Sequence, residues 1–569
     1  MIFELRPMLR GFLLAAKKGS SEMLLILSGA YVESELFSEF GKIPPSFLPV
    51  GNRRLYCYQI EQVGRFYSDI HLTLPDDFEI GEADINYLKA HRVRVYRTNA
   101  GLSLGEAVRA YLGNTETGGR MDILYGDTLI TDADLDSTDW LAVGTSDEYY
   151  HWYHEMPHDG QPGGTWAGMF SFSDSKLLYR KLSEVGDFIT AVKCYGESVP
   201  RMERKQVERW LDFGHVHTYF DSKRLITTER HFNHLTIADG VLTKSSDDPK
   251  KILAEAAWYE NAPPGVKVFL PNLISKQEST PVSYSLEYLS LATLSELYVF
   301  GRLPGRVWKK IFSACDTYFE AASLVPVRAP LPKDFVEITY LKKTVDRLKE
   351  FSGQTGVDLQ SSWTFNGIVT PSLLTMTYEA AAATMSQAPV SSFIHGDFCF
   401  SNIFFDFRSG RLKMVDPRGI DAEGRITQYG DFRYEVGKLA HSILGLYDFI
   451  IARHFSVDIA GSSVSFRVLA DTSSCVQDIF LKTRFMGRTP DHWDCYPVML
   501  LLFLSMLPLH VDDPVRQQAL MANCLRLYLE WKRDVKADEA LHEQLEEDKM
   551  TQGGPAMIAG LPLSEGVKR

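Results

Sequence analysis

A short hairpin flanked by acidic and amide side chains constrains the fold of the C-terminal half more than any other feature. Residues Asn402 to Phe407 and Leu412 to Val415 have the composition of two strands, and an Arg-Ser-Gly turn lies between them. Asp397 precedes this hairpin and Asp416 follows it. Because a hairpin returns the chain to its starting end, Asn402 and Asp416 can reach the same metal ion.

These residue types suit phosphoryl transfer. The reaction needs a carboxylate that orients the attacking hydroxyl and oxygen ligands that hold magnesium on the phosphates. Asp397 and Asn402 are five residues apart, the spacing of the catalytic Asp and the metal-binding Asn in a kinase catalytic loop. We expect His395 to hold this loop by hydrogen bonds rather than to transfer a proton. The pattern predicts an ATP-dependent phosphotransferase centre.

The segments Ile394 to Asn402 and Met414 to Gly419 resemble the aminoglycoside phosphotransferase and choline kinase family. The resemblance covers roughly residues 225–530. It implies that Asp397 orients or deprotonates the acceptor hydroxyl. It also implies that Asn402 and Asp416 bind Mg²⁺.

The same resemblance implies an ATP site upstream of the hairpin. Lys244, at the end of an expected strand, would contact the ATP phosphates, and Glu255 on the next helix would pair with it. Glu287 to Leu289 would form the hinge over adenine, with Glu287 and Leu289 as contacts. Asp431 would brace the catalytic loop, and the chain beyond it is expected to be helical.

The N-terminal part alternates strand-like and helix-like segments from Met23 to about Phe220. Such alternation predicts a mostly parallel sheet with helices on both faces, whose ligands bind beyond the carboxyl ends of the strands. Asp127 and Asp212 each follow an apolar segment next to a glycine. Both could project from that edge towards one cation, as nucleotidyl transfer requires.

Residues 23–220 resemble the sugar-phosphate nucleotidyltransferase family. The resemblance is carried by Met23 to Gly29, Phe47 to Asn52, Ser103 to Val108, Tyr125 to Asp127, Trp166 to Gly168 and Trp210 to Gly214. It implies that Asp127 and Asp212 bind magnesium. The first loop, which contains Gly29, would bind the triphosphate of a second nucleoside triphosphate, with CTP among the candidates. Gly105 would approach the base.

The chain departs from this second family in its basic residues. The usual first loop, rich in glycine and containing arginine, is replaced by the sequence from Ala30 to Glu35, and two family lysines correspond to Pro45 and Met156. Arg53 and Arg54 are candidates for the replacement charge.

The whole chain sets further limits. Its 569 residues predict several domains, and the net charge of −13 argues against nucleic acid as a partner. The scattered cysteines are typical of free thiols in a reducing, cytoplasmic compartment. No apolar run reaches the length of about 18 residues that a membrane span requires, and Pro497 to Leu509 is expected to be a buried helix.

The expected fold class is α/β, with a doubly wound sheet followed by a two-lobed, kinase-like α+β unit. The expected boundaries are an N-terminal extension over residues 1–22, a nucleotidyltransferase-like domain over 23–224, a kinase-like domain over 225–535 and a charged tail over 536–569.

Together the two halves suggest consecutive steps. The kinase half would phosphorylate a small hydroxylated molecule, and the other half would couple the phosphate to a nucleotide, giving an activated unit for surface polysaccharide. Three alternatives stay open: a kinase with a silent N-terminal domain, a nucleotidyltransferase with a degenerate kinase, and a non-enzymatic scaffold. Choline, sugars, polyols and amino alcohols stay open as acceptors, and the oligomeric state is undetermined. Five aromatic residues could cage a quaternary ammonium but at helical spacing favour a core role: Trp308, Tyr318, Tyr340, Trp363 and Tyr378.

Overall fold

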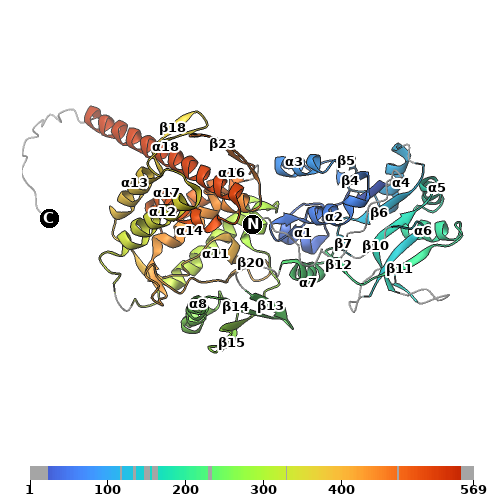
Figure 1. Cartoon of the computed structure of the whole chain (residues 1–569), viewed down its shortest axis with the longest axis horizontal. Helices are drawn as coiled ribbons and strands as arrows, with labels where there is room; N and C mark the ends of the chain where they lie inside the picture. The colour runs from blue at the N-terminus through green and yellow to red at the C-terminus, as the bar shows by residue number, and fades with distance from the viewer. Residues whose placement is uncertain are drawn as a thin grey trace, which may run out of the picture.

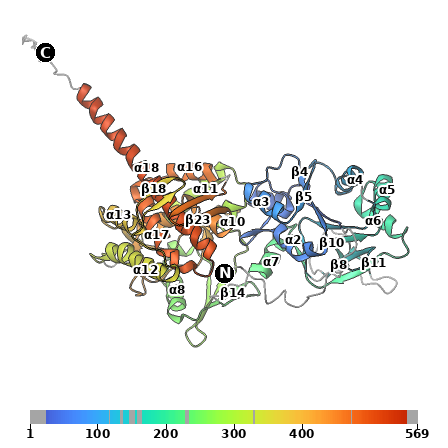
Figure 2. The same cartoon turned by 45° about the horizontal axis from the view of Figure 1, so that its top comes forward.

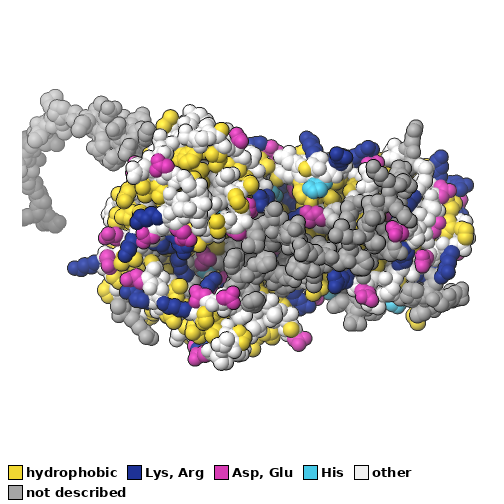
Figure 3. Space-filling view, in the orientation of Figure 1, with side chains coloured by type: hydrophobic (Ala, Val, Ile, Leu, Met, Phe, Trp, Pro, Cys, Tyr) yellow, Lys and Arg dark blue, Asp and Glu magenta, His cyan; other side chains and the backbone are white. Residues whose placement is uncertain are grey.

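The computed structural model describes residues 23–115, 118–131, 136–145, 154–156, 164–227, 234–327, 330–470 and 473–552. The expected extension over residues 1–22 lies outside these ranges. The N-terminal unit and the larger, mainly helical C-terminal unit lie side by side (Figure 1). Basic and acidic side chains are mixed over the face in Figure 3.

A large mixed sheet forms the N-terminal unit, in the order β11-β8-β10-β6-β1-β4-β5 with β9 beside β10. Every pairing that involves β10 is antiparallel and the others are parallel. The strands are β1 (Met23–Leu27), β4 (Asp69–Pro75), β5 (Val93–Thr98), β6 (Met121–Tyr125), β8 (Trp140–Gly144), β9 (His154–Glu155), β10 (Gly164–Phe172) and β11 (Glu203–Val207). Outside it, short β7 (Thr128–Ile130) pairs with β12 (Trp210–Asp212), and β2 (Pro49–Val50) with β3 (Arg53–Arg54).

Helices cover both faces of this sheet. Along β1, Leu24 and Ile26 enter one core while Leu25 enters the other, as the alternation of side chains in a strand requires. The second core includes α4 (Leu104–Asn114), α5 (Ser175–Val185) and α6 (Phe188–Gly196). The first includes α1 (Ser34–Phe40), α2 (Leu55–Val63), α3 (Glu82–Ala90) and α7 (Val216–Thr227), and it continues into the C-terminal unit. The predicted doubly wound, mostly parallel sheet is confirmed.

The C-terminal unit begins with a small antiparallel sheet and one helix. The sheet has the order β13-β14-β16-β15. Its elements are β13 (His234–Ala238), β14 (Val241–Ser245), α8 (Pro249–Asn261), β15 (Leu273–Gln277) and β16 (Ser283–Glu287). Asp248 caps α8 by accepting hydrogen bonds from the amides of Lys250 and Lys251, at 3.1 and 3.3 Å. The strand and helix predicted around Lys244 and Glu255 are therefore present.

A helical lobe follows and carries the predicted hairpin. β20 (Ile403–Asp406) pairs with β21 (Arg411–Met414) in the register Ile403↔Met414. The other elements are α9 (Pro264–Lys267), α10 (Leu294–Val299), α11 (Gly305–Ser323), a π-helical turn (Glu337–Lys342), α12 (Lys343–Thr355), α13 (Leu373–Met385), β19 (Ser391–Phe393), β22 (Tyr429–Asp431), α14 (Phe432–Ile443), α15 (Tyr447–Ile451), α16 (Ser473–Lys482), α17 (Cys495–Met506) and α18 (Pro514–Gln552). The buried helix expected near Pro497 is α17.

The expectation of an all-helical region beyond Asp431 is wrong. β23 (Phe455–Ala460) and β24 (Ser463–Val468) form a hairpin. β24 also pairs with β17 (Trp363–Phe365), which pairs with β18 (Ile368–Thr370). Half of each hairpin strand faces solvent, so its apolar residues alternate rather than recur at helical spacing.

The last helix, α18, extends away from the body of the molecule (Figure 2). It runs to Gln552, through the first part of the expected tail, and residues 553–569 are outside the described structure. Within the described residues, no helix has both the length and the apolar character needed to cross a membrane.

The two units are joined by buried polar contacts as well as by the shared core. Arg54 is 4% exposed and donates hydrogen bonds to the carbonyl of Phe47, at 2.9 Å, and across the boundary to that of Phe300, at 2.8 Å. Lys223 forms an ion pair with Glu296 at 2.7 Å. These contacts fix one unit on the other.

Candidate active sites

The predicted catalytic loop, between β19 and β20, places Asp397 beside one cation and one amide. Lys438 of α14 lies 2.7 Å from Oδ1 of Asp397, and Nδ2 of Asn402 donates to Oδ2 at 3.0 Å. Burial alone would raise the pKa of Asp397, but the charge of Lys438 outweighs it and holds the pKa well below its usual range. Asp397 is therefore a carboxylate, ready to orient a hydroxyl.

Glu435 and His395 hold this loop in place. The carboxylate of Glu435 accepts the backbone N–H groups of His395, at 2.8 Å, and Gly396, at 2.9 Å. Nε2 of His395 contacts the carbonyl of Val415 at 3.0 Å, and burial lowers the pKa of His395 to about 4. The imidazole is neutral and braces the loop, as expected.

Asp431 does not brace the catalytic loop as expected. It accepts hydrogen bonds from the backbone of Val390, at 3.0 Å, and from the guanidinium of Arg433, at 2.9 Å. The bracing residue is Glu435, one turn further along α14. In the sequence, the signal for a bracing role of Glu435 was its position four residues after Asp431, one helical turn along.

Lys244, Glu255 and Asp416 form a second cluster. Nζ of Lys244 lies 2.7 Å from Glu255 and 3.0 Å from Asp416. Tyr284 donates a further hydrogen bond to Glu255 at 2.7 Å. Burial opposes the charge of Lys244, but the two carboxylates outweigh it and raise the pKa of Lys244. The predicted pair of Lys244 and Glu255 is thus in contact, and Lys244 also contacts Asp416, the residue predicted to bind metal.

The predicted adenine hinge ends strand β16. Glu287 is exposed, and its side chain accepts a hydrogen bond from Asn272 at 2.9 Å. Leu289 is half-buried. The backbone N–H of Tyr288 donates a hydrogen bond to the carbonyl of Gly240, in the turn between β13 and β14. This hydrogen bond connects the segment to the turn of the β13–β14 hairpin, which carries Lys244 on its second strand.

A basic cluster next to Asp397 was not predicted from the sequence. Arg418 donates a hydrogen bond to the hydroxyl of Tyr434 at 2.7 Å, and Nζ of Lys343 lies 5.6 Å from the ring centre of Tyr434. Burial would raise the pKa of Tyr434, but Arg418, Lys343 and Lys438 outweigh it and lower it to about 7. These residues come from three separated segments, so no local motif indicates them.

In the N-terminal unit, Asp127 and Asp212 converge. Pairing of β12 with β7 puts Asp212 opposite Thr128. A methyl group at Gly214 would lie 2.8 Å from Oδ2 of Asp127 and 3.2 Å from Oδ1 of Asp212. Burial and the charge of Asp212 raise the pKa of Asp127 to about 7. His215, for which no role was predicted, lies 3.6 Å from Asp212.

The other residues of this unit predicted to contact nucleotide also make contacts within the protein. A methyl group at Gly29 would clash with Thr98 at 2.2 Å, and one at Gly105 would lie 2.0 Å from the carbonyl oxygen of Gly186. Arg53 is paired with Glu61, with Nη1 2.9 Å from Oε2. Arg54, as described above, is instead buried at the boundary between the two units.

Both acid clusters have the chemistry of a magnesium site. In the N-terminal unit, two carboxylates repel each other, which a divalent cation would relieve. In the C-terminal unit, the NH₂ group of Asn402 donates a hydrogen bond to Asp397, so the amide oxygen Oδ1 of Asn402 can serve as a metal ligand. Asp416 keeps 41% of its side chain exposed and supplies a second oxygen donor. Oxygen donors of these types suit Mg²⁺.

The five aromatic residues considered for a cation cage do not form one. Trp308, Tyr318, Tyr340 and Trp363 are buried core residues, and Tyr378 is exposed. Trp308 stacks on Phe400.

No family model and no curated protein sequence matches the chain. Similar solved structures include a Bacillus anthracis protein described as a glucose-1-phosphate thymidylyltransferase, with 13% identity, 37% of this chain and 96% of that chain covered, and a TM-score of 0.30. The inositol-1-phosphate CTP transferase from T. maritima has 14% identity, coverages of 35% and 91%, and a TM-score of 0.28. A gentamicin complex of an aminoglycoside phosphotransferase has 11% identity, coverages of 54% and 95%, and a TM-score of 0.31. The structural neighbours thus include nucleotidyltransferases, on the N-terminal part, and an aminoglycoside phosphotransferase.

Proposed function

We propose that the chain is a bifunctional enzyme whose C-terminal unit phosphorylates a small hydroxylated compound with ATP. The observation that carries this proposal is the pairing of Asp397 with Lys438 beside the joined cluster of Lys244, Glu255 and Asp416. A carboxylate kept ionised can orient a hydroxyl, and a fixed lysine can hold phosphates. Magnesium bound by Asn402 and Asp416 would neutralise phosphate charge.

In the proposed step, the acceptor oxygen attacks the γ-phosphorus of ATP. The bond from the γ-phosphorus to the bridging oxygen breaks, and ADP leaves with that electron pair. The hydroxyl proton passes to Asp397 and then to solvent. Residues Glu435 and His395 keep the loop from moving while this occurs.

The second proposed activity is nucleotidyl transfer in the N-terminal unit. Its product would be a nucleoside-diphosphate-linked building block for surface polysaccharide, formed with release of pyrophosphate. Asp127 and Asp212 support it, because their converging carboxylates suit a cation that bridges phosphates. The alternative is a kinase with a silent nucleotide- or sugar-binding domain. Pro45 and Met156 in place of lysines, and the internal engagement of Arg53 and Arg54, favour that alternative.

The test is a phosphorus NMR time course with magnesium, ATP, CTP, UTP and GTP and a panel of small alcohols and sugars. The wild type is run beside Asp397→Asn and Asp212→Asn. We expect a phosphomonoester that converts to a pyrophosphate-linked product, with each variant blocking one step. If the phosphomonoester accumulates unchanged with every nucleotide, the proposed kinase activity stands and the proposed nucleotidyl transfer is contradicted.

A further inference from the structure

Three cations surround the ring of Tyr434 on the side of the catalytic loop. Arg418 bonds to its hydroxyl, and the charged groups of Arg418 and Lys343 each lie 5.6 Å from its ring centre. Lys438 is one helical turn beyond Tyr434 on α14 and contacts Asp397. The cluster therefore reaches from the π-helical segment to the catalytic carboxylate.

Only part of this positive charge is balanced within the protein. Asp397 compensates Lys438. Among the described residues, neither Arg418 nor Lys343 has a carboxylate within 4 Å, the range of an ion pair. Burial and the two neighbouring cations lower the pKa of Lys343 to about 8.

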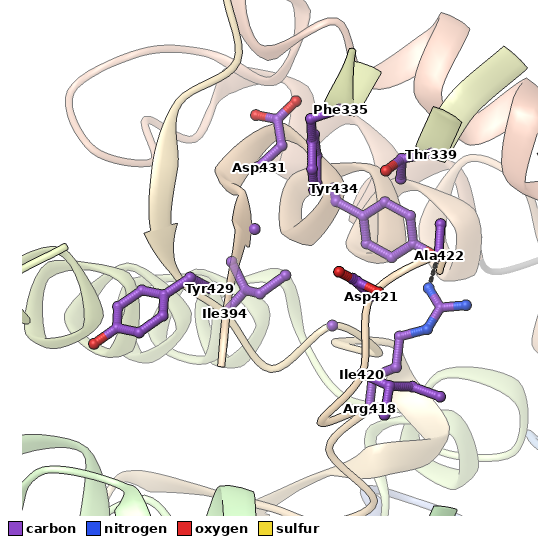
Figure 4. A pocket seen from close by; sticks show the side chains of 12 residues that line it. Phe335, Thr339, Ile394, Arg418, Ile420, Asp421, Ala422, Tyr429, Asp431 and Tyr434 are labelled. Atoms are coloured by element: carbon purple, nitrogen blue, oxygen red, sulfur yellow. Dashed lines mark hydrogen bonds between the residues drawn. The ribbon is translucent and has the colours of Figure 1, made fainter. Parts of the chain in front are cut away.

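The nearby acid Asp421 does not cancel the excess. Asp421 lines the same pocket as Arg418 and Tyr434 (Figure 4), but its carboxylate is paired with Arg425 at 2.7 Å. Its other oxygen accepts the backbone N–H groups of Glu423 and Arg425, at 2.9 Å each. Asp421 is thus committed to its own turn.

Two members of the cluster, Arg418 and Tyr434, line a pocket next to the loop that carries Asp397. Gly396, the residue before Asp397, lines this pocket together with Arg418 and Tyr434. Phe335 and Thr339 line the pocket beside Tyr434, away from Arg418 (Figure 4). Arg418 is only half-buried, so an anion could reach its guanidinium from the pocket.

We propose that the phosphoryl acceptor is an anionic hydroxyl compound whose carboxylate or phosphate binds at Arg418 and Lys343 while its hydroxyl meets Asp397. This inference rests on the kinase function proposed above. Arginine suits such a ligand because its planar donors match the oxygens of carboxylates and phosphates. A quaternary ammonium such as choline would meet like charge here, and the aromatic cage that could have held it is absent among the described residues considered for it.

The first test measures anion binding without turnover. The full chain is saturated with Mg²⁺ and a non-hydrolysable ATP analogue, so that the nucleotide site is filled, and inorganic phosphate is titrated by calorimetry. We expect saturable phosphate binding that weakens at least about tenfold in Arg418→Gln and in Lys343→Gln. The neighbouring exposed residue supplies the control, Lys342→Gln, which should bind as the wild type does.

Binding of the ATP analogue separates the ways in which the proposal can fail. If every protein binds the analogue but phosphate does not bind, or binds equally to Arg418→Gln, the anionic-acceptor proposal is overturned and the kinase proposal stands. The anionic-acceptor proposal is also overturned if Arg418→Gln weakens binding of the analogue instead, because the arginine would then serve ATP. If the wild type does not bind the analogue, the kinase proposal and this inference fail together.

The second test compares acceptors that differ in charge. ADP release is followed with glycerol, choline, glycerate and glycerol phosphate, and with a hexose, its sugar acid and its phosphate. We expect turnover only with anionic members, and Arg418→Gln should raise KM more than it lowers kcat. Preference for the acids or for the phosphates identifies which oxyanion is bound. Faster turnover of a neutral or cationic compound than of its anionic counterpart would overturn the proposal.

Discussion

The two acid clusters differ in how their negative charge is balanced. In the C-terminal unit, Lys438 and Lys244 each lie within 3.0 Å of a carboxylate of the centre. In the N-terminal unit, Asp127 and Asp212 face each other, and the basic side chain beside them is His215, at 3.6 Å from Asp212. Internal ion pairs thus balance the charge of the first centre, whereas the two carboxylates of the second raise each other's energy.

The largest expected effect is on phosphoryl transfer. Asp397→Asn removes the carboxylate that orients the hydroxyl, and kcat should fall by about 10³-fold. The affinity for ATP should change little, because Lys244 remains in place. ADP release and nucleotide binding measure the two quantities, with exposed Asp346→Asn as the control. A loss smaller than tenfold would separate Asp397 from catalysis.

The next effect tests the internal balance of charge. Lys244→Met takes from buried Glu255 its nearer cation and leaves only Lys251, at 3.9 Å, which should lower the free energy of unfolding by about 3 kcal/mol. The double variant Lys244→Met/Glu255→Met should recover part of this loss, since it removes the isolated charge. Urea unfolding measures both, with Lys250→Met, on the helix that carries Glu255, as the control. Equal stability of the single variant and the wild type would contradict the proposed balance.

A third variant asks whether the two centres belong to one cooperative structure. Arg54→Met leaves the carbonyl of Phe300 without its donor across the boundary and Asp84 without its ion pair. We expect a loss of about 2 to 3 kcal/mol and a separation of the unfolding transitions of the two units. Arg53→Met, which changes the adjacent residue paired with Glu61, should leave a single transition. A single transition in Arg54→Met as well would show that the shared core suffices.

The smallest effect concerns the N-terminal acids without metal. The folded-state pKa of Asp127 is raised above its unfolded value to about 7, so its contribution is favourable at low pH and is lost as pH rises through about 4 to 7. Above that window the repulsion between the two carboxylates should lower the free energy of unfolding. In EDTA at pH 8, Asp127→Asn should therefore raise the Tm, and at pH 4 it should not. An equal shift at both pH values would exclude charge repulsion as the cause.

Local patterns predicted much of the first centre. Asn402 and Asp416 could be placed together because a tight turn fixes the hairpin between them. Lys244 and Glu255 could be paired because they lie on a strand and on the helix that directly follows it. In the N-terminal unit, the position of Asp127 followed from the end of a buried strand.

Contacts between distant segments escaped prediction. Lys343, Arg418 and Lys438 meet around Tyr434 only after the helices and the loop are packed. Arg54 could not be assigned to the boundary, because its partner Phe300 is 246 residues away. The β23–β24 hairpin escaped because its strands are half-exposed and because β24 pairs with β17, about 100 residues upstream.

The most direct test of this comparison counts bound metal ions with Mn²⁺ in place of Mg²⁺. Electron paramagnetic resonance at pH 8 would follow free Mn²⁺ in the presence of a non-hydrolysable ATP analogue and CTP. We predict two classes of site, of which Asp212→Ala removes one and Asp416→Ala removes the other. Loss of both classes in either variant, or a single class in the wild type that Asp212→Ala leaves unchanged, would contradict two separate centres.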